Sequence, residues 1–564
     1  MLGNQWFVIA TGNVQSIVDT TSLPAARREV TFAGDTGSIT IFHGSAVLVE
    51  ENDETYSLAV GDVRSLRNLA GFRHSGPSRH AALCVVDKRT GDIRVLTDRI
   101  NFSKIFCFAP ADGCGFAISS HLTFFDRPRL TLSIGGLAST IANGTQFNNS
   151  SVFRDVSVLD RAAIHEFSRS ARKTTTYWHY GFDSAVESPT AKQQMKDVLV
   201  EAVRDQVADR HVLLSLSGGF DSSGILGILA KFVKPKSLKT FSYVSGVPKP
   251  GTDAYVAQQM AALTGYPHEN VQAYDGDIAL TIQRNARLGQ GLSNFCDEID
   301  AWYRQGHTLS DSDVLAGDEC FGWADRHLVS REDVLVLVSL RRFEAAAPLI
   351  PYLAPPLVRE MTDKLAADVE SMLSKTSIAS LHDLKDFLYL DQRIPWGLLP
   401  WRRFIIGELF EVREPFLQTE VLDVIKTLPQ EKRIGKGLYR RAIQELVPEV
   451  FSIPRARSGQ AAPDWKKEML LNRPKIDALL KVPSALDAVI EPAAIVSLLD
   501  SLASQPKARP NWKMVVRQIV GPEATRALRS FVRPELPKVQ SVETILLRLL
   551  VLREFLADKP ASRS

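Results

Sequence analysis

The chain of 564 residues lacks any cysteine arrangement that indicates a disulfide or metal framework. Its five cysteines contain no Cys-x-x-Cys pair and no Cys/His ligand spacing; they are Cys84, Cys107, Cys114, Cys296 and Cys320. Disulfide scaffolds and structural zinc sites depend on such spacings, so the sequence excludes both from the prediction. We expect reduced, buried thiols.

Long apolar runs and a strong excess of one charge are also missing. No stretch reaches the roughly 18 apolar residues that a membrane span needs, and the first residues lack the basic region and apolar run of a secretion signal. Charged residues make up 23% of the chain and the net charge is +3, which gives no sign of a nucleic-acid or membrane-surface protein. The sequence therefore predicts a soluble, cytoplasmic protein with no nucleic-acid or membrane partner.

The chain divides into two parts with different sequence patterns. Up to about residue 180, short apolar strands such as Trp6–Ala10 and Ala81–Val86 alternate with Gly and Asn turns, which predicts a β-rich domain. From Ser188 onward helical periodicities dominate, and beyond residue 330 nearly everything is typical of amphipathic helices with proline breaks. With a prior of roughly 100–200 residues per domain, we predict one domain over residues 1–182 and a second over 190–564.

The most informative segment is residues 212–230. It begins as a buried strand, passes through a Gly218-Gly219 turn and continues as an apolar helix. Adjacent glycines let backbone amides approach a ligand closely, and the helix dipole adds positive potential where Asp221 and Ser222 stand. This geometry suits a phosphate and makes an ATP-consuming enzyme the first hypothesis. The alternative is a plain strand-to-helix turn capped by Asp or Ser.

The order of residues 217–222 resembles the Ser-Gly-Gly-x-Asp-Ser pyrophosphatase loop of enzymes that activate carboxylates as adenylates and cut ATP between its α and β phosphates. Further motifs follow in the order found in the synthetase domain of the asparagine synthetase family, in residues 238–243, 313–322, 409–417 and 435–457. The resemblance implies a doubly wound α/β ATP-pyrophosphatase-loop (PP-loop) synthetase domain with a helical extension. It also implies ATP and Mg²⁺ as cofactors.

The resemblance assigns nucleotide binding to residues on these loops, namely Leu216, Ser217, Gly218, Gly219, Asp221, Ser222, Ser242, Tyr243, Ala316 and Gly317. Two carboxylates from different strand ends, Asp221 and Asp318, are expected to act in catalysis as Mg²⁺ ligands. The metal would bind the ATP phosphates and neutralise the departing pyrophosphate. For Asp318, a helix N-cap is the alternative.

Two further catalytic residues are expected from the later motifs. Glu411 belongs to a segment that lies beside the substrate cleft in the family, although Glu411 and Arg413 can equally form a structural ion pair. Arg457 stands where the family has a Lys that stabilises charge at the adenylated centre and on the pyrophosphate. Arginine keeps the charge but replaces a compact donor with a planar fork.

The N-terminal half resembles the family's glutaminase-like domain, an Ntn-type β-rich sandwich, through residues 87–101 and the Tyr177-Trp178 dipeptide. An α+β domain followed by an α/β domain is therefore expected. Glutamine hydrolysis needs a nucleophilic cysteine directly after the initiator Met, with the free α-amine as its base. Position 2 is Leu2, and no segment resembles the glutamine-binding Asn-Gly-Glu-Ile-Tyr-Asn. We expect a degenerate domain that serves as a scaffold and supplies no ammonia.

Without an ammonia source, the nucleophile must belong to the substrate, as in the relatives that close a ring within one molecule. β-Lactam synthetases have a Tyr, and asparagine synthetases a Glu, three residues before the Asp of the second loop, where this chain has Leu315. A peptide's N-terminal amine has a pKa of about 8 and depends less on a strong base. This favours a lasso peptide cyclase, in which ATP adenylates an Asp or Glu side chain and the N-terminal amine closes an isopeptide (macrolactam) ring.

Three hypotheses follow. The first is the lasso peptide cyclase, whose partners would be a precursor peptide and a leader peptidase or leader-binding protein. The second is a β-lactam synthetase or an ammonia-dependent amide ligase, and the third is a non-catalytic scaffold with a degenerate nucleotide site. AMP release that depends on a peptide separates the first from the other two. Four aromatic residues could wall a cavity for a threaded peptide or simply form core: Trp396, Trp401, Phe404 and Phe416.

Overall fold

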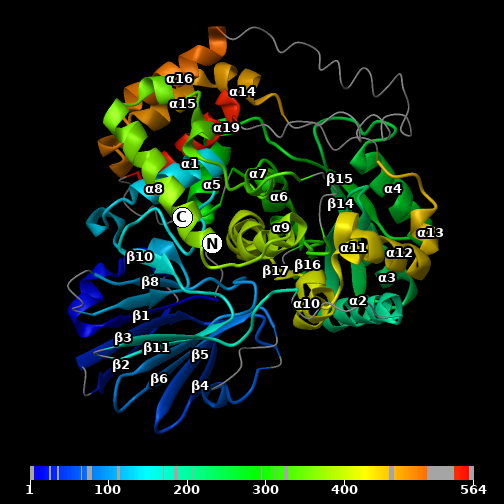
Figure 1. Cartoon of the computed structure of the whole chain (residues 1–564), viewed down its shortest axis with the longest axis horizontal. Helices are drawn as coiled ribbons and strands as arrows, with labels where there is room; N and C mark the ends of the chain where they lie inside the picture. The colour runs from blue at the N-terminus through cyan, green and yellow to red at the C-terminus, as the bar shows by residue number, and fades with distance from the viewer. Residues whose placement is uncertain are drawn as a thin grey trace.

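The computed structural model describes most of the chain. The described residues are 5–24, 27–34, 37–64, 66–72, 79–110, 115–168, 171–182, 189–207, 209–293, 295–309, 311–322, 328–456, 463–504 and 539–557. The N-terminal sheets (blue to cyan) and the C-terminal sheet (green) occupy different parts of the molecule, and a further group of helices lies above the N-terminal sheets in this view (Figure 1).

The N-terminal half forms two six-stranded sheets, with strand orders β10-β8-β9-β1-β3-β2 and β12-β11-β7-β6-β5-β4. Their strands are β1 Phe7–Thr11, β2 Arg27–Gly34, β3 Gly37–Gly44, β4 Leu48–Glu51, β5 Thr55–Gly61, β6 Ala81–Asp87, β7 Ile93–Leu96, β8 Phe106–Phe108, β9 Ala117–Ser119, β10 Val156–Val158, β11 Ala163–Phe167 and β12 Arg172–Thr176. All their pairings are antiparallel. The predicted β-rich N-terminal half is confirmed.

Alternation along the strands explains how the two sheets pack. Phe7 and Ile9 of β1 share one buried cluster with Leu58 of β5, in the other sheet. Val8 and Ala10 belong instead to the cluster on the opposite face, which continues into the helical part of the protein. Since successive side chains of a strand point to opposite faces, β1 contributes to two cores.

The C-terminal half contains a five-stranded, wholly parallel sheet with the order β15-β14-β13-β16-β17. Its strands are β13 His211–Ser215, β14 Ser237–Val244, β15 His268–Gln272, β16 Asp313–Leu315 and β17 Glu411–Arg413. Helix α2 Ala191–Val207 precedes β13, and the helices between β13 and β16 are α3 Phe220–Lys231, α4 Asp253–Thr264, α5 Ile278–Gly289 and α6 Ile299–Leu309. Leu213 and Phe241 pack on one face, and Leu214 and Leu315 on the other. Burial on both faces is expected for a parallel sheet, and the predicted α/β half is confirmed.

The strand order reverses at β13, because the chain adds β14 and β15 on one side and then β16 and β17 on the other. In open α/β sheets, ligands bind outside the carboxyl ends of the strands at such a reversal. The loop after β13 and the loop after β16 leave the sheet at this point. These two loops carry the motifs that the sequence singles out.

The remaining helices divide between a helical layer above the N-terminal sheets, which includes α8 and α19, and a group on α2 and α3, which includes α10, α12 and α13 (Figure 1). They are α7 Arg331–Leu337, α8 Pro355–Leu373, α9 Leu381–Leu388, the π-helical η7 Tyr389–Leu398 and η8 Trp401–Ile405, α10 Thr419–Lys426, α11 Gln430–Arg433, α12 Gly437–Leu446, α13 Pro448–Phe451, α14 Trp465–Leu471, α15 Arg473–Leu480, α16 Pro492–Ser504 and α19 Val542–Phe555. Short 3₁₀ turns connect elements at Gly12–Ile17, Leu69–Gly71, Leu122–Phe124, Arg127–Arg129, Phe343–Ala346, Ile350–Tyr352, Ile406–Glu408, Pro415–Leu417, Ile434–Lys436 and Ala485–Ala488.

Helix α1 (Ile134–Asn143) belongs by sequence to the N-terminal half but packs in the helical layer. It contacts α8 and α19, and every residue after Ile134 is buried (Figure 1). Trp178 Nε1 donates to Asp423 Oδ1 at 3.1 Å, which adds a polar contact between the halves. The domain limits 1–182 and 190–564 stay a prediction, and this packing crosses them.

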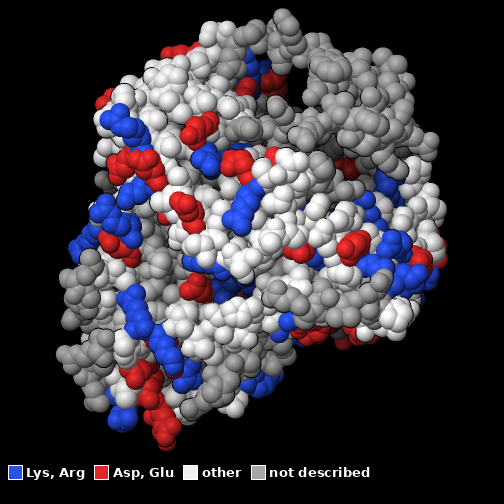
Figure 2. All heavy atoms as spheres, in the orientation of Figure 1, with Lys and Arg blue, Asp and Glu red and all other residues white. Residues whose placement is uncertain are grey.

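The surface agrees with a near-neutral composition. Acidic and basic side chains are interspersed over the face shown in Figure 2. In the part of the chain that the structure describes, no helix is both long and apolar enough to cross a membrane.

Candidate active site

The loop after β13 and the loop after β16 touch each other at the carboxyl edge of the sheet. A Cβ added to Gly317 would lie 3.3 Å from the backbone nitrogen of Ser222 and 3.4 Å from Cβ of Asp221. Ala316 continues the β16 ladder by donating its N–H to the carbonyl of Arg413 at 3.0 Å. The structure therefore brings together the residues that the sequence assigns to nucleotide binding on these two loops.

Hydrogen bonds within the first loop hold its shape. Ser222 Oγ accepts from the N–H of Ser217 at 3.0 Å and lies 3.0 Å from Ser217 Oγ. Ser217 Oγ accepts from the N–H of Gly219 at 3.2 Å, and Asp253 Oδ1 accepts from the N–H of Gly218 at 3.1 Å. The two serines thus brace the turn, and Asp253 joins it to the first turn of α4.

The two glycines are needed for different reasons. A Cβ on Gly218 would lie 2.5 Å from Cβ of Ala456, so the position has no room for a side chain. Gly219 is the N-cap of α3, with φ −79° and ψ 170°, and no described side chain caps this helix. Uncapped first-turn amides and the helix dipole suit a bound phosphate. The sequence argument expected a ligand to require both glycines, whereas a protein neighbour explains Gly218.

A buried lysine connects the two loops. Lys436 Nζ lies 2.8 Å from Asp221 Oδ2 and 2.8 Å from Glu319 Oε1. Burial lowers the pKa of Lys436, but Glu319 and Asp221 outweigh this effect and hold the pKa above its ordinary value. Lys436 adopts a left-handed backbone conformation with φ 61°, which is unusual for a residue with a side chain and turns the chain into α12. Its charge is therefore permanent and aimed at the loop contact.

The site fits a Mg²⁺ ion that is bound mainly by phosphate oxygens. Asp221 Oδ1 is buried and has no hydrogen-bond partner among the described residues. Mg²⁺ commonly takes one or two protein carboxylates and completes its shell with phosphate oxygens and water. No group of three or more His, Cys, Asp or Glu side chains that could hold a metal occurs in the described ranges. The donor set therefore suits a phosphate-bound metal and not a cage built by protein alone.

Asp318 is engaged by an arginine from the helical layer. Arg402 donates from Nε to Asp318 Oδ2 at 2.7 Å and from Nη2 to Oδ1 at 3.3 Å. Arg402 Nε also lies 3.7 Å from Glu414 Oε1. Burial and the nearby Asp318 raise the pKa of Glu414 well above its ordinary value, although Arg402 opposes them. Asp318 can serve a metal only through lone pairs that Arg402 leaves free.

The end of β14 closes another side of the site. Ser242 Oγ donates to the carbonyl of Leu216 at 2.6 Å, so both predicted residues lie beside the loop. Burial and then Glu298 raise the pKa of Tyr243 well above its ordinary value, which keeps the phenol neutral. Burial and Asp297 raise the pKa of Glu298 to about 8.

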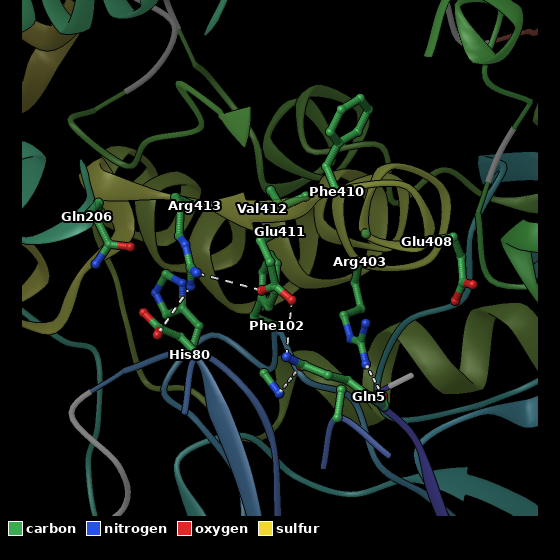
Figure 3. A pocket seen from close by; sticks show the side chains of 14 residues that line it. Gln5, His80, Phe102, Gln206, Arg403, Glu408, Phe410, Glu411, Val412 and Arg413 are labelled. Atoms are coloured by element: carbon green, nitrogen blue, oxygen red, sulfur yellow. Dashed lines mark hydrogen bonds and ion pairs between the residues drawn. The ribbon is translucent and has the colours of Figure 1, made fainter. Parts of the chain in front are cut away.

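The structure does not bring Glu411 to these loops. β17 runs parallel to β16 and pairs Glu411 with Asp313, at the amino end of both strands. Glu411 Oε1 accepts from Gln5 Nε2 at 3.1 Å and lines a cavity of about 240 Å³ between the two halves of the protein (Figure 3). Parallel strands place their amino ends on the opposite edge from the loops, so the family segment meets the site through its later residues.

The ion pair that the sequence proposes between Glu411 and Arg413 is present at 3.7 Å. Arg413 has closer partners, Asp313 at 3.1 Å and Asp62 at 3.2 Å, and so joins the sheet to the N-terminal half. Arg457 lies outside the described residues.

The sequence analysis did not predict three residues of the site: Arg402, Glu414 and Lys436. Glu414 carries a usable signal, since it directly follows a strand and precedes Pro415, which places it at the carboxyl edge. Lys436 stands within the closing motif, but nothing in the sequence shows that it reaches Asp221. Arg402 has no local signal, because its partner Asp318 is 84 residues away.

Comparison with known proteins gives the family of the chain. The family model described as asparagine synthase matches residues 194–524. Among solved structures, the glutamine phosphoribosylpyrophosphate amidotransferase from B. subtilis, complexed with ADP and GMP, is similar at 9% identity over 48% of this chain and 60% of that protein, with a TM-score of 0.17. That overlap is too low to argue for a shared fold. No curated protein matches.

The family match includes both loops, β17 and the Lys436 segment, and it spans more than half of the chain. The protein therefore belongs to the asparagine synthase family.

Proposed function

We propose that the protein is a lasso peptide cyclase. In this reaction ATP adenylates the side chain of an Asp or Glu in a precursor peptide and releases pyrophosphate. The peptide's own N-terminal amine then attacks the activated carbonyl, so that an isopeptide bond forms and AMP leaves. One oxygen of the side-chain carboxylate leaves with AMP. The ring product is therefore lighter than the linear peptide by one water.

The adenylation half of this proposal uses the two loops. The uncapped start of α3 would receive phosphate oxygens, and Lys436 would offset the charge that develops on the leaving pyrophosphate. Asp221 Oδ1 would hold Mg²⁺, which when bound neutralises phosphate charge. We extend this charge-stabilising role to Arg457 on the family resemblance alone.

The observation that carries the proposal is the lack of a source of ammonia in the N-terminal half. Leu2 replaces the required cysteine, and all four cysteines that the structure describes are buried. Burial raises the pKa of Cys107 to about 11, so it is not a thiolate at neutral pH. Asp98, in the matching motif, accepts backbone N–H groups of Ile100 and Phe102 at 3.0 Å each and has a structural role.

The position before the second loop favours an amine that needs little activation. Leu315 is fully buried and apolar, so it offers no proton acceptor where relatives have Tyr or Glu. A peptide α-amine with a pKa of about 8 is partly neutral at pH 7 to 8. A β-lactam synthetase or an ammonia-dependent amide ligase remains the alternative product assignment within the same family.

The proposed walls of a peptide cavity need revision. Trp396, Phe404 and Phe416 are buried, and Phe416 packs edge-on against Phe321 at 5.5 Å between ring centroids. These three are core residues. Trp401 is half-buried beside Arg402 and is the aromatic that we propose for contact with the peptide.

The test uses the full-length protein with ATP, Mg²⁺ and a leader-trimmed peptide whose Asp or Glu lies several residues from a free N-terminus. Mass spectrometry should detect AMP, pyrophosphate and a peptide lighter by one water. The matched control is the same peptide with an acetylated N-terminus, which should not cyclise. Equal cyclisation of the acetylated peptide, or preferred use of ammonia or of a small β-amino acid, would favour the alternative. A leader peptidase or leader-binding protein is the partner that we propose.

A further inference from the structure

Arg403 is a buried arginine whose charge lacks a close partner. Its exposed fraction is 8%, and its one hydrogen bond among the described residues runs from Nη2 to the carbonyl oxygen of Gln5 at 3.1 Å. A guanidinium has five N–H donors, and no carboxylate in the described ranges forms an ion pair with Arg403. Burial lowers the pKa of Arg403, although Glu408 and Glu411 act in the opposite direction. A buried cation in this state gains strongly from an anion that accepts hydrogen bonds.

Arg403 lines the cavity between the two halves of the protein, together with Glu411 (Figure 3). The cavity volume is about 240 Å³, whereas one water needs only about 10–15 Å³ by the same measure, so the cavity has room for a small organic molecule. None of the residues that line it belongs to the glutaminase-like segments, residues 87–101 and Tyr177-Trp178. The cavity is also separate from the nucleotide loops, because Glu411 lies at the amino end of β17.

Glu411 supplies the opposite charge in the same cavity. Its Oε1 accepts from Gln5 Nε2 at 3.1 Å, while its Oε2 lies 3.7 Å from Arg413 Nη2. The second contact is longer than a hydrogen bond, and Arg413 has two closer carboxylate partners. Oε2 is therefore available to a further donor. Gln5 contacts both charged groups, Arg403 through its carbonyl oxygen and Glu411 through its side-chain amide, and both side chains point toward it in Figure 3.

The charges of the cavity indicate which kind of ligand fits. Glu408 and Glu411 are acidic and Arg403 is basic, and Glu408 lies 3.6 Å from His121 Nε2. An anion without a cationic group would add to the excess of negative charge. A cation without an acceptor would leave the N–H donors of Arg403 unmatched. A molecule with one carboxylate and one ammonium group satisfies both side chains and leaves the net charge unchanged.

We propose that this cavity binds a free α-amino acid as a zwitterion, with its carboxylate on Arg403 and its ammonium group on Oε2 of Glu411. A single carbon separates the two groups of an α-amino acid, and the two side chains that would hold them contact one residue, Gln5. The amino acid is a ligand here, and no covalent step is involved. The proposal therefore goes beyond the proposed ligase reaction and does not depend on its product.

The first experiment measures the binding of three probes to the full-length protein by calorimetry at neutral pH. L-Alanine carries both charged groups, N-acetyl-L-alanine keeps only the carboxylate, and L-alaninamide keeps only the ammonium group. Wild-type protein should bind alanine about tenfold or more tightly than either of the other probes, because each of them loses one charge-assisted contact. Equal binding of the three probes, or no detectable binding of alanine, overturns the proposal without any variant.

The second experiment uses two variants that remove one charge each. Glu411→Gln can still accept the hydrogen bond from Gln5, and it should bind alanine about tenfold or more weakly and lose the preference for alanine over N-acetylalanine. Arg403→Met should lose the preference for alanine over alaninamide. Glu420→Gln, at an exposed position of α10, is the matched control and should behave like wild type. Alanine binding of wild-type strength in Glu411→Gln overturns the proposal. If Arg403→Met fails to fold, Arg403→Lys must still bind alanine more weakly than wild type, because it loses the planar fork.

The third measurement separates this cavity from the candidate active site. Alanine binding is compared in the absence and presence of saturating ATP and Mg²⁺. Because Glu411 lies at the amino edge of the sheet and the nucleotide loops at the carboxyl edge, the two affinities should agree within about twofold. Competitive displacement of alanine by ATP would overturn the assignment to this cavity. None of these measurements needs a peptide, so a failure of the lasso assignment leaves the amino-acid site standing, and the reverse also holds.

Discussion

At the scale of single residues, the two site carboxylates differ in what else they hold. Asp221 shares Lys436 with Glu319, so removing its charge leaves that lysine with a partner. Asp318 is the closest anion to Arg402, whose side chain is only 24% exposed. The same substitution at the two positions should therefore affect activity alike and stability differently.

We expect Asp221→Asn to abolish conversion of ATP to AMP while changing the free energy of unfolding by less than about 1 kcal/mol. Asp318→Asn should also abolish turnover, and should destabilise the protein by about 1–3 kcal/mol because it leaves Arg402 partly buried and poorly paired. Turnover is measured as AMP release and stability by thermal unfolding. Wild-type turnover in Asp221→Asn would remove our assignment of the metal ligand.

A second residue-scale prediction concerns Lys104, which is buried in the N-terminal half. Its Nζ donates to the carbonyl of Asn101 at 3.0 Å and lies 4.9 Å from the ring centroid of Trp396. Burial lowers the pKa of Lys104 to about 7, while the unfolded chain has a lysine pKa of about 10.4. Between these values the unfolded chain binds the proton that the folded protein has lost. The free energy of unfolding should therefore rise with pH, by about 1 kcal/mol per unit.

Lys104→Met has no such proton and should lack this increment. Thermal unfolding at pH 7 and pH 9 gives the melting temperature of each protein, and comparison of the two proteins cancels other titrating groups such as Glu298. The melting temperature of wild type, relative to the variant, should be higher at pH 9 than at pH 7. A difference that is constant with pH would contradict the lowered pKa.

At the scale of elements, the loop between β13 and α3 depends on how closely other segments approach it. A Cβ added to Gly218 would lie 2.5 Å from Cβ of Ala456. A Cβ added to Gly219 would have Ser217 Oγ as its nearest atom, at 3.1 Å, and this hydroxyl can rotate. A backbone-anchored neighbour cannot move as easily as a hydroxyl. The two glycines of one motif should thus respond differently to the same added methyl group.

Gly218→Ala should destabilise the protein by about 1–3 kcal/mol through overpacking and raise the KM for ATP, because the loop must shift away from residue 456. Gly219→Ala is the matched control and should affect the KM for ATP less. Steady-state AMP release at varied ATP concentration distinguishes them. A larger effect at Gly219 would mean that the bound nucleotide, and not Ala456, limits space at this turn.

At the scale of the whole molecule, the two halves are joined by more than a linker. Helix α1 lies within the layer of α8 and α19, and the rings of Phe106 and Phe404 approach to 6.3 Å across the halves. His80 Nε2 also lies 3.0 Å from the carbonyl oxygen of Leu417. These contacts predict that the C-terminal half depends on the N-terminal half for its folded structure.

We expect residues 190–564 expressed alone to be insoluble or to lack fixed tertiary structure. Without the N-terminal half, the apolar surfaces that face α1 and Phe106 become exposed to solvent. Solubility and near-ultraviolet circular dichroism provide the measurement, with the full chain as reference. Co-expression of residues 1–182 should restore part of the soluble protein. A folded, ATP-consuming fragment 190–564 would show that the N-terminal half is dispensable.

The sequence by itself determined what is local. The strand, the Gly-Gly turn and the start of α3 are continuous in the chain, so their residue types and order predict the loop and its phosphate chemistry. The sequence likewise shows directly that position 2 is Leu2 and not a cysteine. The change from strand-like to helical sequence patterns predicted both halves, because hydrophobic periods of 2.0 and 3.6 residues can be recognised without tertiary contacts.

Only the tertiary structure decided which of the distant residues meet. The parallel pairing of β16 with β17 places Glu414 at the carboxyl edge and Glu411 at the amino edge, although the two are three residues apart in sequence. Packing of η8 against α5 delivers Arg402 to Asp318. These outcomes depend on strand direction and on long-range packing, which local residue patterns do not encode.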